Sequence, residues 1–233
     1  MPRPDTRAPT GEPLVGDVVR LDPLTPEDAP GLFEVFADPG VFEHGFRMLD
    51  RLTRPAQAEA LVASHLAARP GRTAYTVRLV GDGELGPAGT VVGTSSLGDI
   101  DVPNESVHLG WTTYASRWWG TAVNPEAKLL LLAHAFEDCG FGRVQIQTDV
   151  VNERSQAAIS RLGAVREGVL RRVARRADGS WRDTVVFSVL VDEWPVVRGR
   201  LQARIGAPTE VRASPGAPPG LPPESGSRPP AGP

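Results

Sequence analysis

The stretch RWWGTAVN, residues 117–124, indicates how the rest of the chain is arranged. A run of β-forming residues precedes it, and a long apolar segment follows it up to Gly140. Asn124 is a favourable N-cap and Pro125 suits a first helical position, so we expect a helix to begin here and to run through Cys139. A strand, a loop of small residues and a helix N-terminus together direct free backbone N–H groups toward an anion. We therefore expect this loop to bind phosphate.

Composition narrows the class of protein. The 233 residues carry a net charge of −3, which argues against a nucleic-acid or membrane-surface partner. The basic run 171–176 is better explained as a solvated hairpin than as a nucleic-acid site. Cys139 is the only cysteine, and no apolar run has the length of a signal peptide or a membrane span. We expect a cytoplasmic protein.

Low-complexity segments flank one predicted domain, residues 14–205. Residues 1–13 are rich in Pro and Arg, and residues 206–233 are rich in Gly and Pro with almost no large apolar side chains. Neither segment can bury enough surface to offset its ordering entropy, so we expect both to be disordered.

Hydrophobic periodicity and turn residues predict alternating strands and helices. We expect strands at 18–24, 75–80, 90–97, 105–114 and 143–148, helices starting at 26, 55, 125 and 153, a polar loop at 98–104, and a last hairpin of 165–174 and 181–190 around a two-residue turn at Asp178-Gly179. This order predicts an α/β (α+β) fold. Its sheet is mixed, mostly antiparallel and of about six to seven strands, with helices on both faces.

Six blocks in this order resemble the Gcn5-related N-acetyltransferases (GNAT), and within them the RimJ/RimL-type ribosomal-protein N-acetyltransferase branch. The blocks are LGWT (109–112), WGTAVN (119–124), TDVVNERS (148–155), RLGA (161–164), EGVLR (167–171) and RDT (182–184). The resemblance implies a GNAT fold with a splayed sheet and acetyl-CoA as donor. The acceptor would be an amine, either a protein N-terminus or a small molecule. Homodimers are common among such proteins, although the sequence does not fix the oligomeric state.

The phosphate-binding loop fits the pyrophosphate of coenzyme A, because Gly120 leaves room where backbone and phosphate approach. The resemblance places the strand 109–112 beside the pantetheine arm, with the N–H of Gly110 or Trp111 near the thioester oxygen. It also implies that Asn152 contacts this arm. The expected cofactor-binding residues are Leu109, Gly110, Trp111, Thr112, Arg117, Trp119, Gly120, Thr121, Ala122, Val123, Asn124, Asn152 and Ser155.

The sequence identifies the catalytic residues less directly than the cofactor-binding residues. His108 stands where related sequences often carry Glu, and it is the expected base, with Glu105 and Asp99 as alternatives. The RimL-type resemblance suggests Ser155 as general acid, while Ile159 occupies the position of the Tyr that many members use. The alternative is that the thiolate leaves without a dedicated acid. Lys128 either helps to bind the phosphates or lies on the solvated surface.

Two other functions stay open on the sequence. One is a module of this fold that binds acyl-CoA without turnover. The other is a domain for a different nucleotide, although both a Walker-type Lys and a G-x-G-x-x-G motif after a strand are missing. No His and carboxylate spacing suggests a metal. The acceptor amine would lie among 44–52, 98–104 and 171–176.

Overall fold

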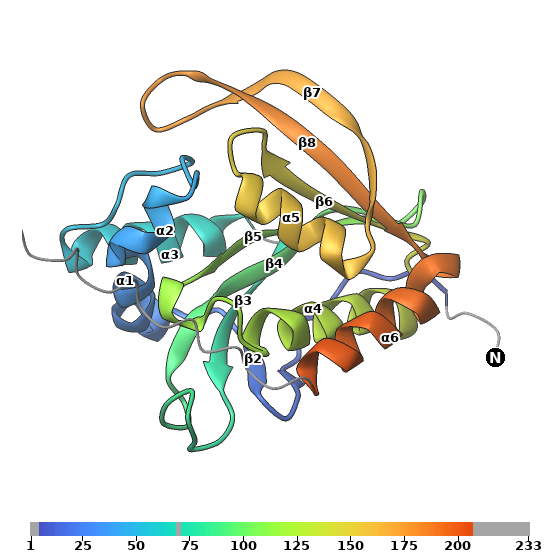
Figure 1. Ribbon diagram of the computed structural model, residues 1–233, viewed down its shortest axis with the longest axis horizontal. Helices are drawn as coiled ribbons and strands as arrows, with labels where there is room; N and C mark the ends of the chain where they lie inside the picture. The colour runs from blue at the N-terminus through green and yellow to red at the C-terminus, as the bar shows by residue number, and fades with distance from the viewer. Residues whose placement is uncertain (1–4, 69–70, 207–233) are drawn as a thin grey trace, which may run out of the picture.

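The computed structural model describes residues 5–68 and 71–206, and these form an eight-stranded sheet with helices on both faces (Figure 1). The strand order is β1-β2-β3-β4-β5-β6-β8-β7, and every neighbouring pair is antiparallel except β5 and β6. The strands are β1 (Leu14–Val15), β2 (Val19–Pro23), β3 (Arg72–Leu79), β4 (Val91–Asp101), β5 (Ser106–Tyr114), β6 (Arg143–Asp149), β7 (Val165–Arg175) and β8 (Trp181–Leu190). The predicted mixed fold is confirmed, with slightly more strands than expected.

Helices pack in two groups. Helices α4, α5 and α6 lie together on one face of the sheet, while α1 and α3 pack on each other and on β3 and β4 (Figure 1). The helices are α1 (Ala29–Ala37), α2 (Pro39–Glu43), α3 (Pro55–Ala67), α4 (Val123–Ala133), α5 (Glu153–Leu162) and α6 (Trp194–Ile205).

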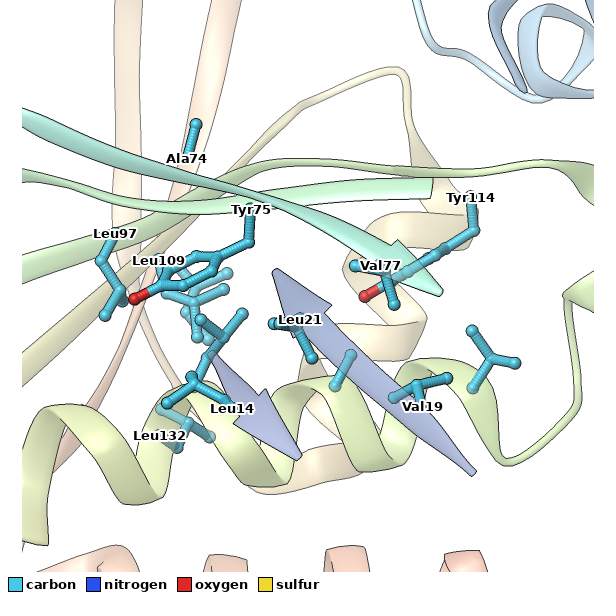
Figure 2. Close-up of a cluster of buried hydrophobic side chains, with 14 of the residues drawn as sticks. Leu14, Val19, Leu21, Ala74, Tyr75, Val77, Leu97, Leu109, Tyr114 and Leu132 are labelled. Atoms are coloured by element: carbon cyan, nitrogen blue, oxygen red, sulfur yellow. The ribbon is translucent and has the colours of Figure 1, made fainter. Parts of the chain in front are cut away.

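The main core fills the space between the sheet and α4. Figure 2 shows Leu21, Leu97 and Leu109 from three strands pointing toward Leu132 on this helix, whereas Ala74 points to the other face. The four leucines are buried. Because side chains alternate along a strand, this set fixes which residues of β5 face α4.

Several boundaries differ from the prediction. Helix α4 begins at Val123 with Ala122 as N-cap, two residues before the expected start, so Asn124 lies inside the helix. The helix ends in a π-helical turn, His134–Asp138, before Gly140. The expected polar loop at 98–104 is wrong in its first half, because β4 continues to Asp101.

Three further elements were not predicted from the sequence. Strand β1 has two residues, α2 follows α1 after a single residue, and α6 has no strong amphipathic pattern that would mark it. The last hairpin closes through residues 176–180 rather than a two-residue turn, because Arg175 pairs with Trp181.

The start of the described chain packs on the domain, although residues 1–13 were expected to be disordered. The Arg7 N–H donates to the Cys139 carbonyl at 2.9 Å, and the Thr6 hydroxyl donates to the Gly140 carbonyl at 2.8 Å. The Thr73 hydroxyl reaches the Pro9 carbonyl at 3.4 Å. The predicted C-terminal tail, apart from Gly206, lies outside the described residues.

Strands β5 and β6 separate along their length. They pair in parallel only from Ser106↔Arg143 to His108↔Gln145, although β5 continues to Tyr114 and β6 to Asp149. Beyond His108, β5 therefore has an edge with no strand partner among residues 5–68 and 71–206.

A buried carboxylate fixes the first turn of α4 against the N-terminal strands. Glu126 is 4% exposed and accepts from the N–H groups of Asp17, Val18 and Val19 at 3.0, 2.7 and 2.6 Å. A Cβ on Gly16 would lie 2.5 Å from the Glu126 carboxyl carbon, so glycine permits this approach. The contact holds the helix N-terminus in register with the sheet.

We expect Glu126→Gln to lower the free energy of unfolding by about 2–4 kcal/mol, because the amide leaves buried N–H donors unsatisfied. Urea denaturation measures this change. Glu34→Gln on α1 is the matched control, since Glu34 is exposed, and its change should stay within about 0.5 kcal/mol. Equal effects of the two substitutions would contradict the role of Glu126.

Candidate active site

The loop before α4 presents free backbone N–H groups. Gly120 has φ +80°, a region that glycine adopts readily, and a Cβ there would meet nothing within 4 Å. The Thr121 hydroxyl donates to the Trp118 carbonyl at 2.7 Å, which closes the turn. Within residues 5–68 and 71–206, the N–H groups of 120–122 have no acceptor. These donors lie at the N-terminus of an eleven-residue helix, which favours an anion.

Aromatic and basic side chains surround this loop. The Arg154 guanidinium of α5 lies 3.3 Å from the ring centre of Trp119, and the ring of His44 meets the same Trp edge-on at 5.4 Å. Arg117 is exposed and stacks on Trp118 at 3.7 Å. The loop, the start of α5 and the segment after α2 thus meet at one place. Arg154 had not been predicted as a site residue.

Strand β5 carries a bulge where its edge is free. Thr94 pairs with Thr113 and Ser96 with Gly110, so one residue of β4 faces two residues of β5, Trp111 and Thr112. Trp111 has φ +49°, an uncommon conformation for a residue with a bulky side chain. A bulge at a strand edge turns backbone groups out of the ladder. Here it places them at the opening between β5 and β6.

His108 lies at the apex of this opening. Its Nδ1 is 3.0 Å from the Asp99 carboxylate, and because a carboxylate only accepts, Nδ1 carries the proton. Nε2 is buried and has no partner in the described part of the chain. A Cβ on Gly110 would lie 2.6 Å from this Nε2, so the ring covers the glycine. Burial lowers the pKa of His108, against the Asp99 hydrogen bond that raises it.

The opposite face of β5 holds Lys128. This residue is 6% exposed, and its ammonium donates to the Thr112 hydroxyl at 3.1 Å. Burial lowers the pKa of Lys128 from its ordinary value to about 7. The alternative of a solvated surface lysine is therefore wrong.

The predicted residues of α5 lie at its first turn. Asn152 is the N-cap, and its side-chain oxygen accepts from the Ser155 N–H at 3.0 Å. Ser155 is half-buried, and Ile159, one turn further along, is buried. Asn152 therefore has the structural role that its position suggests, and its amide nitrogen stays available.

The predicted segment 44–52 meets the β7–β8 hairpin, but at residues beyond the predicted range 171–176. The Ala177 N–H donates to the Arg47 carbonyl at 3.0 Å, and Arg182 lies 3.2 Å from the Met48 sulfur. A hollow of about 200 Å³ lies between the segment after α2 and the hairpin tip. The third segment contributes Asp99 beside His108 instead. The hollow is lined by Phe42, Phe46, Arg47, Leu49, Asp50, Arg51, Ala177 and Asp178.

Other predicted residues serve the core rather than an open surface. The side chains of Leu109 and Val123 are buried among apolar neighbours, so only their backbone could contact a ligand. Tyr114 is also on β5, and its hydroxyl is buried without a partner in the described residues, as is the Ser96 hydroxyl. The Tyr114 ring packs over Gly93 of β4, so its hydroxyl belongs to the core rather than to the free edge of β5.

The model of the acetyltransferase (GNAT) domain family matches residues 19–165. The chain belongs to the GNAT acetyltransferase family. The match contains α4 with its loop, the bulged strand and the first turn of α5.

Individual relatives agree with this membership. YdaF of Bacillus subtilis, provisionally named a ribosomal N-acetyltransferase, is 32% identical over 106 residues, which are 46% of this chain and 57% of YdaF. A provisionally assigned acetyltransferase from T. thermophilus is 38% identical with a TM-score of 0.74, covering 85% of this chain and 100% of that one. Mycobacterium smegmatis RimJ, solved with CoA-disulfide, is 21% identical with a TM-score of 0.64 and shares the fold over 82% of this chain and 92% of its own.

Among residues 5–68 and 71–206, no group of three or more His, Cys, Asp or Glu side chains could hold a metal ion. In the same ranges no helix is both long and apolar enough to cross a membrane.

Proposed function

We propose that this GNAT-family chain transfers an acetyl group from acetyl-CoA to an amine by direct attack. The observation that carries the proposal is the free, bulged edge of β5 beside a helix N-terminus with unpaired N–H groups. One face of the site thus offers donors to an anion, and the edge offers a strand partner to an extended amide arm.

The donor would bind along this path. The N–H groups of 120–122 and the charge of Arg117 would hold the pyrophosphate, while residues 109–112 would pair with the pantetheine arm. The side chain of Asn152 would contact the same arm from the other side of the opening. When bound, acetyl-CoA supplies an activated acyl carbon.

The acceptor would approach from the face that holds His108. With Nδ1 held by Asp99, the free Nε2 of His108 can take the proton that the amine loses on attack. A backbone N–H at the bulge, from Gly110 or Trp111, would hold the developing oxyanion. A protein N-terminus, as the name of YdaF suggests for that relative, and a small amine both suit this face.

A ligand panel read by thermal shift tests the donor. A ligand at about a hundred times its dissociation constant adds roughly 2.7 kcal/mol to stability. Acetyl-CoA should raise the melting temperature, and ATP and NAD should not. A shift with ATP or NAD and none with acetyl-CoA would contradict the proposal and favour a domain for a different nucleotide.

We expect Gly120→Val to weaken acetyl-CoA binding about ten- to a hundredfold. A β-branched residue strains the φ of +80°, which shifts the loop, and its side chain fills the space that the phosphates need. Calorimetric titration measures the affinity.

Gly179→Val is the matched control for this substitution. Gly179 has the same φ, and a Cβ there also meets nothing within 4 Å, but it lies in the β7–β8 turn. It should lose similar stability and keep its affinity for acetyl-CoA. Equal affinities of the two variants would place the phosphates elsewhere.

A further inference from the structure

Lys128 is a buried cation without a counter-ion. It is the only lysine in the chain, and within residues 5–68 and 71–206 no carboxylate lies within ion-pair distance of its ammonium. Its hydrogen bond goes to the Thr112 hydroxyl, which itself lies 2.7 Å from the Ser95 hydroxyl. The ammonium has three N–H donors, and two neutral hydroxyl groups stabilise its charge only weakly. An apolar side chain of similar length would suit this burial better.

The position of Thr112 tells what Lys128 can reach. Thr112 belongs to the β5 bulge, on the strand edge that β6 leaves free. Its hydroxyl faces α4, whereas on the other face the His108 ring packs against Trp111 with the ring centres 4.8 Å apart. Lys128 and His108 therefore flank the same bulge from opposite faces of the sheet.

The phosphate loop is a poor alternative partner for this ammonium. Lys128 lies five residues beyond Val123, where α4 begins, which corresponds to a rise of about 7–8 Å along the helix axis. Its side chain is also directed to Thr112 rather than back to Gly120. An extended cofactor arm that starts at the loop and follows β5 would bring its thioester end, not its phosphates, to the bulge.

We propose that Lys128 contacts the sulfur of the bound thioester and donates the proton with which coenzyme A leaves as a thiol. This inference rests on the proposed function. The amine nitrogen bonds to the acyl carbon, the C–S bond breaks and its electron pair passes to sulfur, which takes a proton from the Lys128 ammonium. The Lys128 side chain, now a neutral amine, then regains a proton from solvent. A lysine pKa of about 7, lowered by burial, makes this transfer to a thiolate favourable.

This role explains a departure noted in the sequence. Position 159, where many family members carry Tyr, holds Ile159, which is buried and has no proton to donate. Helices α4 and α5, which carry Lys128 and Ser155, lie on the same face of the sheet (Figure 1). Since an ammonium of lowered pKa is a far stronger acid than a hydroxyl, Lys128 rather than Ser155 is the better donor.

Binding of coenzyme A and of desulfo-coenzyme A, which lacks the sulfur, tests the contact without turnover. Calorimetry on the full chain gives both dissociation constants for wild type and Lys128→Met. Wild type should bind coenzyme A about tenfold more tightly than desulfo-coenzyme A, because a charge-assisted bond is gained. In Lys128→Met the two constants should be equal, with desulfo-coenzyme A bound as in wild type.

The other outcomes separate the two proposals. If Lys128→Met loses affinity for both ligands equally, the ammonium contacts the phosphates or another part of the arm. This result would overturn the inference. An unchanged ratio of the two constants would do the same. If neither ligand binds wild type, the proposed function itself fails. Thr112→Val, nearly isosteric, supplies a second variant, and it should reduce the ratio by removing the bond that positions Lys128.

Discussion

Lys128→Met is expected to raise the free energy of unfolding at pH 6 by about 2–4 kcal/mol. Removing a buried charge that has no counter-ion and replacing it with an apolar side chain of similar volume relieves a desolvation penalty. The bond to Thr112 is lost, but Thr112 keeps its contact with Ser95. A gain of this size at a single buried position is unusual, because most core substitutions destabilise.

The stability that Lys128→Met gains over wild type should decrease as the pH rises. The pKa of Lys128 is about 7 in the folded chain and 10.5 for an ordinary lysine, so between these values the unfolded chain binds more protons. Wild-type stability therefore rises with pH from about 7 to 10.5, and below pH 7 the full penalty is present. The advantage of Lys128→Met should shrink toward zero near pH 10. His108, the titratable group across the bulge, stays neutral in this window.

Because Lys128 is the only lysine, labelling with ε-¹³C-lysine gives a single side-chain resonance. Its NMR titration reports the pKa directly, and urea denaturation at pH 6 and pH 10 reports the stability. Thr112→Val is the control for lost hydrogen bonding, and it should not raise stability. A resonance that titrates near 10.5, or a Lys128→Met variant less stable than wild type at pH 6, would contradict the account.

His108→Ala should lower kcat/KM for acetyl transfer by roughly 10²–10⁴, the usual contribution of a positioned base. Affinity for acetyl-CoA should change little, since the ring lies on the face of β5 away from α4. Steady-state kinetics and calorimetry separate the two effects. His65→Gln on α3 is the control, because within residues 5–68 and 71–206 no hydrogen bond, ion pair or ring contact joins His65 to His108 or to the bulge, and Arg72 alone lies near both His65 and Trp111. Its kinetics should match wild type. Parallel losses of turnover and donor affinity would argue for a structural role instead.

The pH profile gives a second readout of His108. Catalysis needs the neutral ring, so kcat/KM should rise with pH through its pKa, which burial places below the ordinary value of about 6.5. Asp99 raises this pKa through its hydrogen bond. Asp99→Asn should therefore move the rising limb to lower pH. If the rising limb of the pH profile stays at the same pH in Asp99→Asn, it reports the titration of a group other than His108.

The fold was predictable where local chemistry fixes it. Gly163 closes α5 in a left-handed conformation after a helix capped by Asn152, as the sequence indicated. The start of helix α4 was not predicted correctly. Asn124 and Pro125 indicated that the helix begins at residue 125, whereas it begins at Val123. The Glu126 contact with residues 17–19 is a tertiary constraint on this turn, and no local pattern reveals it.

The site was predictable as a set of backbone positions and less so as side chains. Gly120 could be identified because a loop before a helix requires small residues near an anion. Lys128 could not be assigned, since its burial depends on the packing of α4 under β5. Arg154 likewise follows only from its contact with Trp119 across the opening. Contacts between distant elements decide that Lys128 lies at the bulge and Arg154 at the loop before α4.

In the proposed reaction, acetyl-CoA bound along β5 gives up its acetyl group to an amine. The most direct test is thiol release from acetyl-CoA in the presence of a panel of peptide N-termini and small amines, with the acetylated product identified by mass spectrometry. We expect steady, multiple turnovers with at least one amine, and these turnovers should depend on His108. Tight acetyl-CoA binding without any acetylated amine across the panel would contradict it and indicate an acyl-CoA-binding module without turnover.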